Sequence, residues 1–425
     1  MSDITAPGFP EEEVRRRARL GAAAAFPPPG EYGQVLYGGG RVPAGSGAPD
    51  ALDALRLVPP VFMPGRLARL VELGHEPTYR DVDLEVTVGG FHSALPLYLS
   101  ALGSTRAAGD RGLGLALSRQ AGVMGVPLVI GENVTSVHGY GRGGDAPGDS
   151  SVLARLVAYA ETAPEGRGGV VVQQSTEDAD AEVWNLAYSD PAAQPLLDSG
   201  RLAFELKAGQ GAKPGLGGMT VLPEAAAERM REHFVVDPLF EGRRVLRSGS
   251  PGTLTEEILR QQIRLMRNNY PRARVWVKLP PGRDVADAAR LAVAAGADAV
   301  TVDGAEGGTG WAPEVFLGQV GLPLAECLRR LGGPLPGLLV SGGMWEGGRA
   351  VKCLALGATA VGLGRAALLA VAEDPRQGLA RLVECLALEM RLLISALGKY
   401  RPDVLGPEDL WSPSVPPSNR LDSSR

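Results

Sequence analysis

A lysine- and glycine-rich stretch, residues 207–218, has a composition suited to anion binding. It reads KAGQGAKPGLGG and holds two lysines and five glycines. Because a glycine inside a helix or strand costs roughly 1 kcal/mol relative to alanine, these residues predict a loop. A flexible backbone beside the ammonium groups of Lys207 and Lys213 favours close contact with an anion. The alternative is that both lysines only face water.

Glycine turns recur near the end of the chain, in the stretches SGGMWEGGRA and VGLGRAAL. Each turn joins an apolar run to the start of a helix. Gly342, Gly343, Gly362 and Gly364 leave backbone N–H groups free to point at an anion, and the helix N-termini that follow add positive potential. Arg365 adds a charge-assisted contact. Two such loops in succession favour a phosphate site over glycines that only close tight turns.

A lysine also lies inside an apolar run, at Lys278 in VWVKLP. Burying this side chain is costly unless it meets negative charge. In a phosphate-binding barrel such a cation would stabilise electron density on a cofactor ring; otherwise it lies at the rim in water. The glycines of the following stretch VTVDGAEGGTGWAP let the backbone pass close to a flat ligand. Its Asp303 and Glu306 are expected to stabilise the loop or support the site rather than to act as acids.

The elements that must position these residues alternate between strand and helix. Helix-like stretches such as TLTEEILRQQIRLMRNN separate most of the apolar runs. Continuous apolar strands are typical of a parallel sheet buried on both faces, and eight of them predict an α/β fold, a (β/α)8 TIM barrel. The candidate loops then lie at the C-terminal rim, where barrel active sites are found. An open doubly wound sheet is the alternative. The runs are 95–102, 126–133, 169–175, 202–209, 274–280, 299–308, 337–343 and 360–366.

The 425 residues suit one barrel with extensions. We expect a partly helical N-terminal extension over 1–80, the barrel over 81–405 and a flexible C-terminal tail over 406–425. The net charge of −5 argues against a general nucleic-acid binder. Three widely spaced cysteines are too few for a disulfide framework or a zinc site, so no metal is expected. Neither a secretory signal nor a membrane-spanning run is found, which predicts a cytoplasmic protein.

Several motifs occur in an order that is known from one enzyme family. They are GQGAKPGLGG, VKLPPG, VDGAEGGTGWAPEVFLGQVGLPLAE, VSGGMWEGGRAVKCLALGATAVGLGRAAL and LEMRLLISALGKYRPDVLGPEDL. Together they resemble the FMN-binding synthase domain of glutamate synthase and its stand-alone relatives, over about residues 80–410. The combination of QGAKPG with GGTG is specific to that family, whereas the ending GLGRA is shared by many FMN barrels.

The resemblance implies FMN as cofactor, with its phosphate on the two late glycine turns and Arg365. Lys278 would lie at the N1/O2 edge of the flavin, where a cation stabilises the anionic reduced ring. The implied cofactor-binding residues are Ser100, Ala101, Lys278, Gly307, Gly308, Thr309, Ser341, Gly342, Gly343, Gly362, Gly364 and Arg365.

The resemblance also implies a substrate pocket. Gln210 and Lys213 would contact a 2-oxo acid and its imine, and Glu132 matches the glutamate of the family's GEGG loop; these three are the candidate catalytic residues. Ser175 and Met219 complete the implied substrate-binding set. In the family's chemistry ammonia attacks a 2-oxo acid, and a hydride passes from reduced FMN to the imine. The protein would contribute position and charge, because the flavin performs the redox step.

Three departures from the family pattern bear on function. The family's enzyme carries three cysteines for an iron–sulfur cluster after the last strand, where this chain has Cys385 alone; one thiolate cannot hold a cluster, so none is expected. Leu216 and Met219 stand where the family has a glutamate and a glutamine, which predicts a product other than glutamate. The chain starts MSDI, without a nucleophilic cysteine, so glutamine hydrolysis would require another chain.

The sequence therefore predicts an FMN-dependent oxidoreductase that acts on a carbon–nitrogen bond of an amino acid or a 2-oxo or imino acid. Alternatives are an FMN-dependent oxidase or dehydrogenase of another small carboxylic acid, or a flavin-binding subunit without catalysis. A hydroxy-acid oxidase needs a histidine base near a late strand, and an IMP-dehydrogenase-like enzyme needs a cysteine in the sixth-strand loop; neither is present. A separate electron-donor or amidotransferase protein and a homo-oligomer are left open. Neither a nucleic acid nor a membrane is expected as partner.

Overall fold

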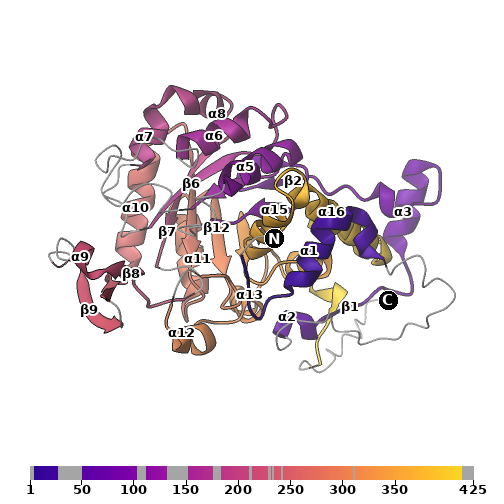
Figure 1. Cartoon of the computed structure of the whole chain (residues 1–425). Coiled ribbons are helices and arrows are strands. Elements are labelled where there is room, and N and C mark those ends of the chain that lie inside the picture. Colours follow the sequence, from indigo (N-terminus) through magenta and orange to yellow (C-terminus); the bar gives the residue numbers. More distant parts are fainter. Residues whose placement is uncertain are drawn as a thin grey trace.

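The structure is a computed structural model built around a closed barrel of eight parallel strands (Figure 1). The last strand pairs in parallel with the first, which closes the sheet. The predicted TIM barrel is confirmed, and the open doubly wound sheet is excluded. In chain order the strands are β4 (Leu97–Leu99), β5 (Leu128–Ile130), β6 (Val170–Ser175), β7 (Leu202–Lys207), β11 (Arg274–Leu279), β12 (Ala299–Asp303), β13 (Leu338–Ser341) and β14 (Ala360–Leu363). The structure describes residues 4–26, 50–102, 112–131, 152–175, 183–209, 213–227, 231, 234–240, 243–309 and 312–413.

Helices surround the barrel, and α10 shows how the sequence sets their limits. The Thr255 side chain caps its N-terminus by accepting a hydrogen bond of 3.2 Å from the backbone of Ile258. Apolar residues then recur every three or four positions and face the barrel. None of the helices in the described ranges has the length and apolarity needed to span a bilayer. The barrel helices are α5 (Leu113–Met124), α6 (Val152–Ala160), α7 (Val183–Ser189), α8 (Gln194–Asp198), α10 (Glu256–Asn269), α11 (Val285–Ala294), α12 (Glu314–Gln319), α13 (Leu324–Leu331), α14 (Gly347–Ala355), α15 (Arg365–Glu373) and α16 (Gly378–Ala396).

A hairpin closes the N-terminal end of the barrel. Its strands are β2 (Val86–Val88) and β3 (Phe91–Ser93). Trp276 of β11 points inward, contacts Phe91 at 5.7 Å between ring centroids, and donates a hydrogen bond of 2.9 Å to the Gly89 carbonyl. Apolar residues from the other strands complete this floor, whereas the inward positions nearer the carboxyl ends of the strands are polar.

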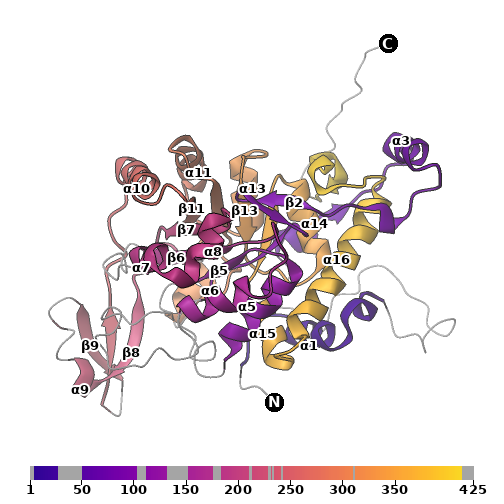
Figure 2. The same cartoon turned by 90° about the horizontal axis from the view of Figure 1, so that it is seen from above.

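The described part of the N-terminal extension packs on the last helices of the barrel. It contains α1 (Glu11–Leu20), η1 (Gly21–Ala25), α2 (Ala51–Ala54), β1 (Arg56–Leu57), α3 (Pro64–Leu73) and η3 (Tyr79–Asp81). Figures 1 and 2 both show α1 beside α15 and α16. Arg15 of α1 pairs with Glu373 at 3.0 Å, and Arg17 pairs with Glu389 at 3.0 Å. Since these arginines are largely buried, their ion pairs link the extension firmly to the barrel.

The first residues assigned to the C-terminal tail contain secondary structure. The sequence predicts a flexible segment from residue 406, yet η8 (Pro407–Asp409) and β15 (Leu410–Trp411) follow directly. β15 pairs antiparallel with β1 of the extension, with Arg56 opposite Trp411. Two strands of two residues each carry no recognisable period, which is why only the tertiary pairing reveals them.

A small antiparallel sheet between β7 and α10 was also not predicted. It consists of β8 (Met219–Pro223), β9 (Val235–Phe240) and β10 (Arg244–Ser248), with β10 in the middle and α9 (Glu224–Ala227) after β8. The sheet projects away from the barrel in both views (Figures 1 and 2). A proline in β9 and arginines in β10 hide the strand pattern. Because the sheet follows β7, it extends the rim loop that contains the lysine- and glycine-rich stretch.

Candidate active site

The carboxyl ends of the barrel strands bring several predicted site residues to one rim. Strand register places Lys278 of β11 beside Lys207 of β7, and Asp303 of β12 beside Ser341 of β13. Ser341 lies in turn beside Gly362 of β14. All five residues are buried. The closed parallel sheet thus turns positions far apart in the sequence into neighbours around the barrel mouth.

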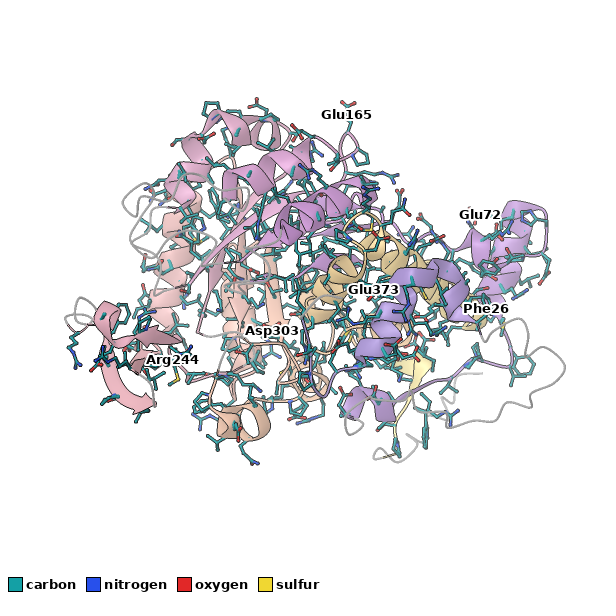
Figure 3. All side chains as sticks on the ribbon, viewed as in Figure 1. Phe26, Glu72, Glu165, Arg244, Asp303 and Glu373 are labelled. Carbon is teal, nitrogen blue, oxygen red and sulfur yellow. The ribbon has the colours of Figure 1, made fainter. Side chains whose placement is uncertain are left out.

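A buried ion pair joins β11 and β12. Lys278 Nζ lies 2.9 Å from Asp303 Oδ2, and the two side chains are 9% and 8% exposed. The Ser341 hydroxyl donates a hydrogen bond to the Asp303 carboxylate, which is labelled in Figure 3. Lys278 is therefore not a rim lysine in water, and Asp303 supports the site as its counter-ion. A cation held in this way can stabilise negative charge on a bound ring without first reorganising.

A second buried acid, Glu205, lies on β7 two residues before Lys207. Its Oε2 accepts a hydrogen bond of 2.5 Å from Gln173 Nε2, and its Oε1 accepts one from the Thr301 hydroxyl. Burial raises the pKa of Glu205, and the nearby Lys278 opposes this shift. Glu205 was not predicted from the sequence, and Lys207 was expected only to contact an anion or to face water. Their alternation with apolar residues in β7 is the signal that both face the barrel interior.

Replacing Glu205 by glutamine is expected to flatten the pH dependence of stability. A carboxyl whose folded pKa is raised stabilises the fold below its ordinary pKa of 4.5 and loses that contribution as the pH rises through the folded value. The melting temperature of Glu205→Gln relative to wild type should therefore increase from pH 5 towards pH 8. The exposed Glu165→Gln, labelled in Figure 3, is the matched control. If the difference in melting temperature between Glu205→Gln and wild type stayed constant over this pH range, the raised pKa of Glu205 would be contradicted.

Two buried hydroxyls at the barrel mouth find no hydrogen-bond partner in good geometry among the residues that the structure describes. They belong to Tyr98 and Ser100, the first on β4 and the second directly after it. A β-carbon on Gly362 would lie 2.1 Å from Ser100 Oγ and 2.7 Å from the Tyr98 hydroxyl oxygen. Burial and the Asp303 carboxylate raise the pKa of Tyr98 well above its ordinary value, so the phenol stays neutral. Unsatisfied buried polar atoms are rare in native proteins. These hydroxyls beside a bare glycine fit the polar edge of a bound ring.

One predicted phosphate loop leads into α15, and the other follows β13. Arg365 is the first residue of this helix, and Gly364 before it supplies no side-chain cap. Gly342 and Gly343, after β13, have φ angles of 123° and 68°, in the region that favours glycine. Gly308, from the loop after β12, packs on the arginine: a β-carbon there would lie 3.0 Å from Arg365 Cγ. A helix N-terminus, glycine turns and a guanidinium therefore fit a phosphate group.

Lys213 is held in a place that the sequence does not indicate. Its Nζ donates hydrogen bonds to the Ala305 carbonyl at 3.1 Å and the Leu317 carbonyl at 3.2 Å. The residue is 2% exposed, and burial lowers the pKa of its ammonium, with Glu306 opposing the shift. Lys213 therefore does not face water. It links the loop after β7 to the loop and helix after β12.

The other predicted residues are distributed as follows. Ser175 ends β6 beside Lys207, and Ala101 follows Ser100 after β4. Gly307 and Thr309 flank Gly308 in the loop after β12. Met219 begins β8, where it pairs with Ser248 in the inserted sheet. Two predicted catalytic residues, Glu132 and Gln210, lie outside the described residues.

The cysteines lie on helices around the barrel, and the histidines lie in the N-terminal hairpin, after α3 or outside the described residues. Cys327, Cys353 and Cys385 lie on three different helices, and burial raises the pKa of each thiol to about 12. Within the described ranges, no group of three His, Cys, Asp or Glu residues is arranged to hold a metal ion. His92 lies on β3 at the opposite end of the barrel, and His75 follows α3. A cavity of about 410 Å³ also lies away from the rim, between residues 82–85 and α16.

Comparison with known proteins links this site to one family. Residues 158–374 match the model of the conserved region in glutamate synthase. A glutamate synthase large subunit-like protein of Rhizobium meliloti is 36% identical over 183 residues, 40% of this chain and 40% of that protein. The archaeal-type glutamate synthase [NADPH] of Dehalococcoides mccartyi is 34% identical over 184 residues, 41% of this chain and 36% of that protein. The aligned part thus spans well under half the length of these relatives.

Solved structures agree with the fold. A chimera of (S)-mandelate dehydrogenase superposes with a TM-score of 0.55 at 20% identity, covering 95% of this chain and 99% of that chain. A flavocytochrome b2 variant gives a TM-score of 0.52 at 18% identity, covering 85% and 76%. At these identities the likeness concerns the barrel architecture alone.

Proposed function

Because the chain belongs to the glutamate synthase family, we propose that it is an FMN-dependent oxidoreductase acting on a carbon–nitrogen bond of an amino acid or a 2-oxo or imino acid. The observation that carries the proposal is the buried Lys278–Asp303 pair at the rim that also holds the glycine turns. A phosphate anchor holds FMN in place, and a fixed charge near the ring is one means by which a protein tunes the electronics of the flavin. FMN, when bound, would supply hydride exchange at its N5 atom.

The chain's own residues would hold the cofactor and control its charge. Gly342, Gly343, Gly364 and Arg365 would bind the phosphate through backbone N–H groups and the guanidinium. Lys278 would stabilise negative charge on the ring, and Asp303 would keep this lysine in place. The remaining contacts would come from Ser100, Ala101, Gly307, Gly308, Thr309, Ser341 and Gly362. No iron–sulfur cluster is proposed, since the cysteines lie on separate helices.

The substrate would bind above this cofactor site, with Gln210, Lys213 and Glu132 in catalytic roles and Ser175 and Met219 as further contacts. We infer a carboxylate substrate from the cationic loop after β7. Leu216, which is buried, and Met219 stand where the family has polar residues, and this supports a substrate other than glutamate. The rival proposal is an oxidase or dehydrogenase of another small carboxylic acid. A third proposal is that the chain is a flavin-binding subunit without catalytic activity.

Partners and location belong to the same proposal. Ammonia or electrons would come from a separate amidotransferase or electron-donor protein, or from the substrate itself. A cytoplasmic homo-oligomer is compatible with the composition of the chain. The relative from Dehalococcoides mccartyi is named a glutamate synthase [NADPH], so reduced nicotinamides belong in any screen of electron donors.

The proposal is tested by isolating the protein and identifying its flavin. The purified protein should be yellow and release FMN; a colourless protein that cannot be reconstituted with FMN would exclude it. Flavin reduction is then followed anaerobically with amino acids, 2-hydroxy acids and reduced nicotinamides. Reduction by an amino acid, or reoxidation of the reduced protein by a 2-oxo acid plus ammonia, supports carbon–nitrogen chemistry. Reduction by hydroxy acids alone favours the rival proposal.

Substituting Lys213 by alanine should separate substrate chemistry from cofactor binding. We expect FMN to stay bound while turnover falls about 100-fold, because a cation is lost from the substrate loop. The matched control is Lys352→Ala: this lysine also donates to a carbonyl, that of Leu52 at 2.9 Å, but lies on α14. Its turnover should stay near wild type. Loss of flavin from Lys213→Ala would instead assign this lysine to the cofactor site.

A further inference from the structure

The segment before α1 reaches the predicted phosphate site. Phe9 is 6% exposed, and its ring lies under the Arg365 guanidinium, with Cζ 4.4 Å from the ring centroid. The two residues are more than 350 positions apart in the sequence. Phe9 belongs to the same hydrophobic core as the residues of α15 that follow Arg365. The ring is therefore fixed by the body of the protein and is not a loose terminal contact.

The extension also supports the loop after β13. Arg17 of α1 lies over the Trp345 ring at 4.7 Å. Asp50, at the N-cap of α2, pairs with Arg349 at 2.5 Å. The guanidinium of Arg349 in turn borders Gly343: a β-carbon on that glycine would lie 2.9 Å from Arg349 Nη2. Contacts from the extension thus reach both loops that are proposed to bind phosphate.

Arg365 is a guanidinium in unusual surroundings. Burial lowers its pKa, and Glu306 opposes this shift. Its Nη2 donates a hydrogen bond to the backbone carbonyl of Glu306 rather than to a carboxylate. An aromatic face stabilises a desolvated cation and also fixes the plane of the guanidinium. Among the described residues no carboxylate forms an ion pair with Arg365, so this arginine, oriented by the ring, keeps its charge available for an anion.

We propose that Phe9 is a positioning residue for the phosphate group of FMN: it holds Arg365 in the orientation that binds the phosphate, so the N-terminal extension sets the affinity for the phosphorylated cofactor. This inference rests on the FMN site of the proposed function. It predicts an effect that depends on the phosphate, since Phe9 contacts the arginine that is proposed to bind this group. Removal of the ring should therefore weaken FMN more than riboflavin, which lacks the phosphate.

The test is a titration of the flavin-free full chain with FMN and with riboflavin, followed by flavin fluorescence. Phe9→Leu, which keeps the site apolar but removes the π face, should weaken FMN about fivefold and change riboflavin affinity less than twofold. Phe9→Tyr should bind both flavins like wild type. Phe26→Leu is the matched control, because that ring belongs to the same extension and is 53% exposed. In an Arg365→Met background, Phe9→Leu should have no further effect on FMN.

Three results would overturn the inference. Equal weakening of FMN and riboflavin would mean that Phe9 only supports the fold, and unchanged FMN affinity would mean that the ring does not act on the arginine. If Phe9→Leu fails to fold, Phe9→Met is used instead, because methionine fills more of the volume of the phenylalanine ring. The same selective weakening of FMN binding is expected for it. A wild-type protein that binds neither flavin would refute the proposed function itself, and the inference with it. If the wild-type protein binds FMN but the Phe9 variants show no selective loss of FMN affinity, the inference alone is refuted.

Discussion

Replacing Lys278 by methionine is expected to lower the free energy of unfolding by about 3–5 kcal/mol. The substitution leaves the Asp303 carboxylate buried without its cation, and an unpaired buried charge is far more costly than the net worth of the pair. Because methionine keeps most of the side-chain volume, the loss of stability reflects the missing charge rather than a change in packing. Urea unfolding of the flavin-free protein measures the change. In the flavin-bound protein, the rate at which substrate reduces the flavin should fall about 100-fold, because the negative charge on the reduced ring loses its stabilising cation.

The control for Lys278→Met is an ion pair at the surface. Arg272 and Asp198 form one with side chains 48% and 70% exposed. Arg272→Met should cost at most about 1 kcal/mol, since water and salt screen this pair. Adding Asp303→Asn to Lys278→Met should restore part of the lost stability, because the uncompensated charge is then removed. A Lys278→Met protein as stable as the Arg272 variant would contradict the buried pair.

Replacing Trp276 by alanine should cost a similar amount, about 3–5 kcal/mol, for a different reason. Its side chain is fully buried, contacts the rings of Phe91 and Tyr98, and donates to the Gly89 carbonyl. Truncation opens a cavity in the barrel floor and leaves that carbonyl unsatisfied. Since Trp276 lies two residues before Lys278 on the same face of β11, the barrel mouth should also loosen. FMN affinity is expected to fall together with the melting temperature.

Trp411 provides the matched control for this variant. It is half exposed and lies in the short strand β15. Trp411→Ala should change the free energy of unfolding by less than about 1 kcal/mol and leave FMN affinity unchanged. If Trp276→Ala were no less stable than Trp411→Ala, the hairpin would not close the barrel floor as described.

The sequence alone determined the barrel and the position of its functional rim. Apolar runs buried on both faces can only form a sheet covered by helices, and glycine turns at the ends of such runs predict where backbone can approach a ligand. Lys278 was recognisable because a cation inside an apolar run demands a partner. These are local signals, carried by neighbours in the chain, and the structure places them where the pattern predicts.

Tertiary structure decided the partners of these residues. Asp303 becomes the counter-ion of Lys278, and Glu205 gains Gln173 and Thr301, only because parallel strands from distant parts of the chain close into a barrel. Lys213 gains the carbonyls of Ala305 and Leu317, which lie 92 and 104 residues later in the chain. The contact of Phe9 with Arg365 joins the N-terminal extension to the barrel, and the pairing of β1 with β15 joins it to the segment after α16. Composition and periodicity describe which face of an element is buried; they contain no information on which distant element covers it.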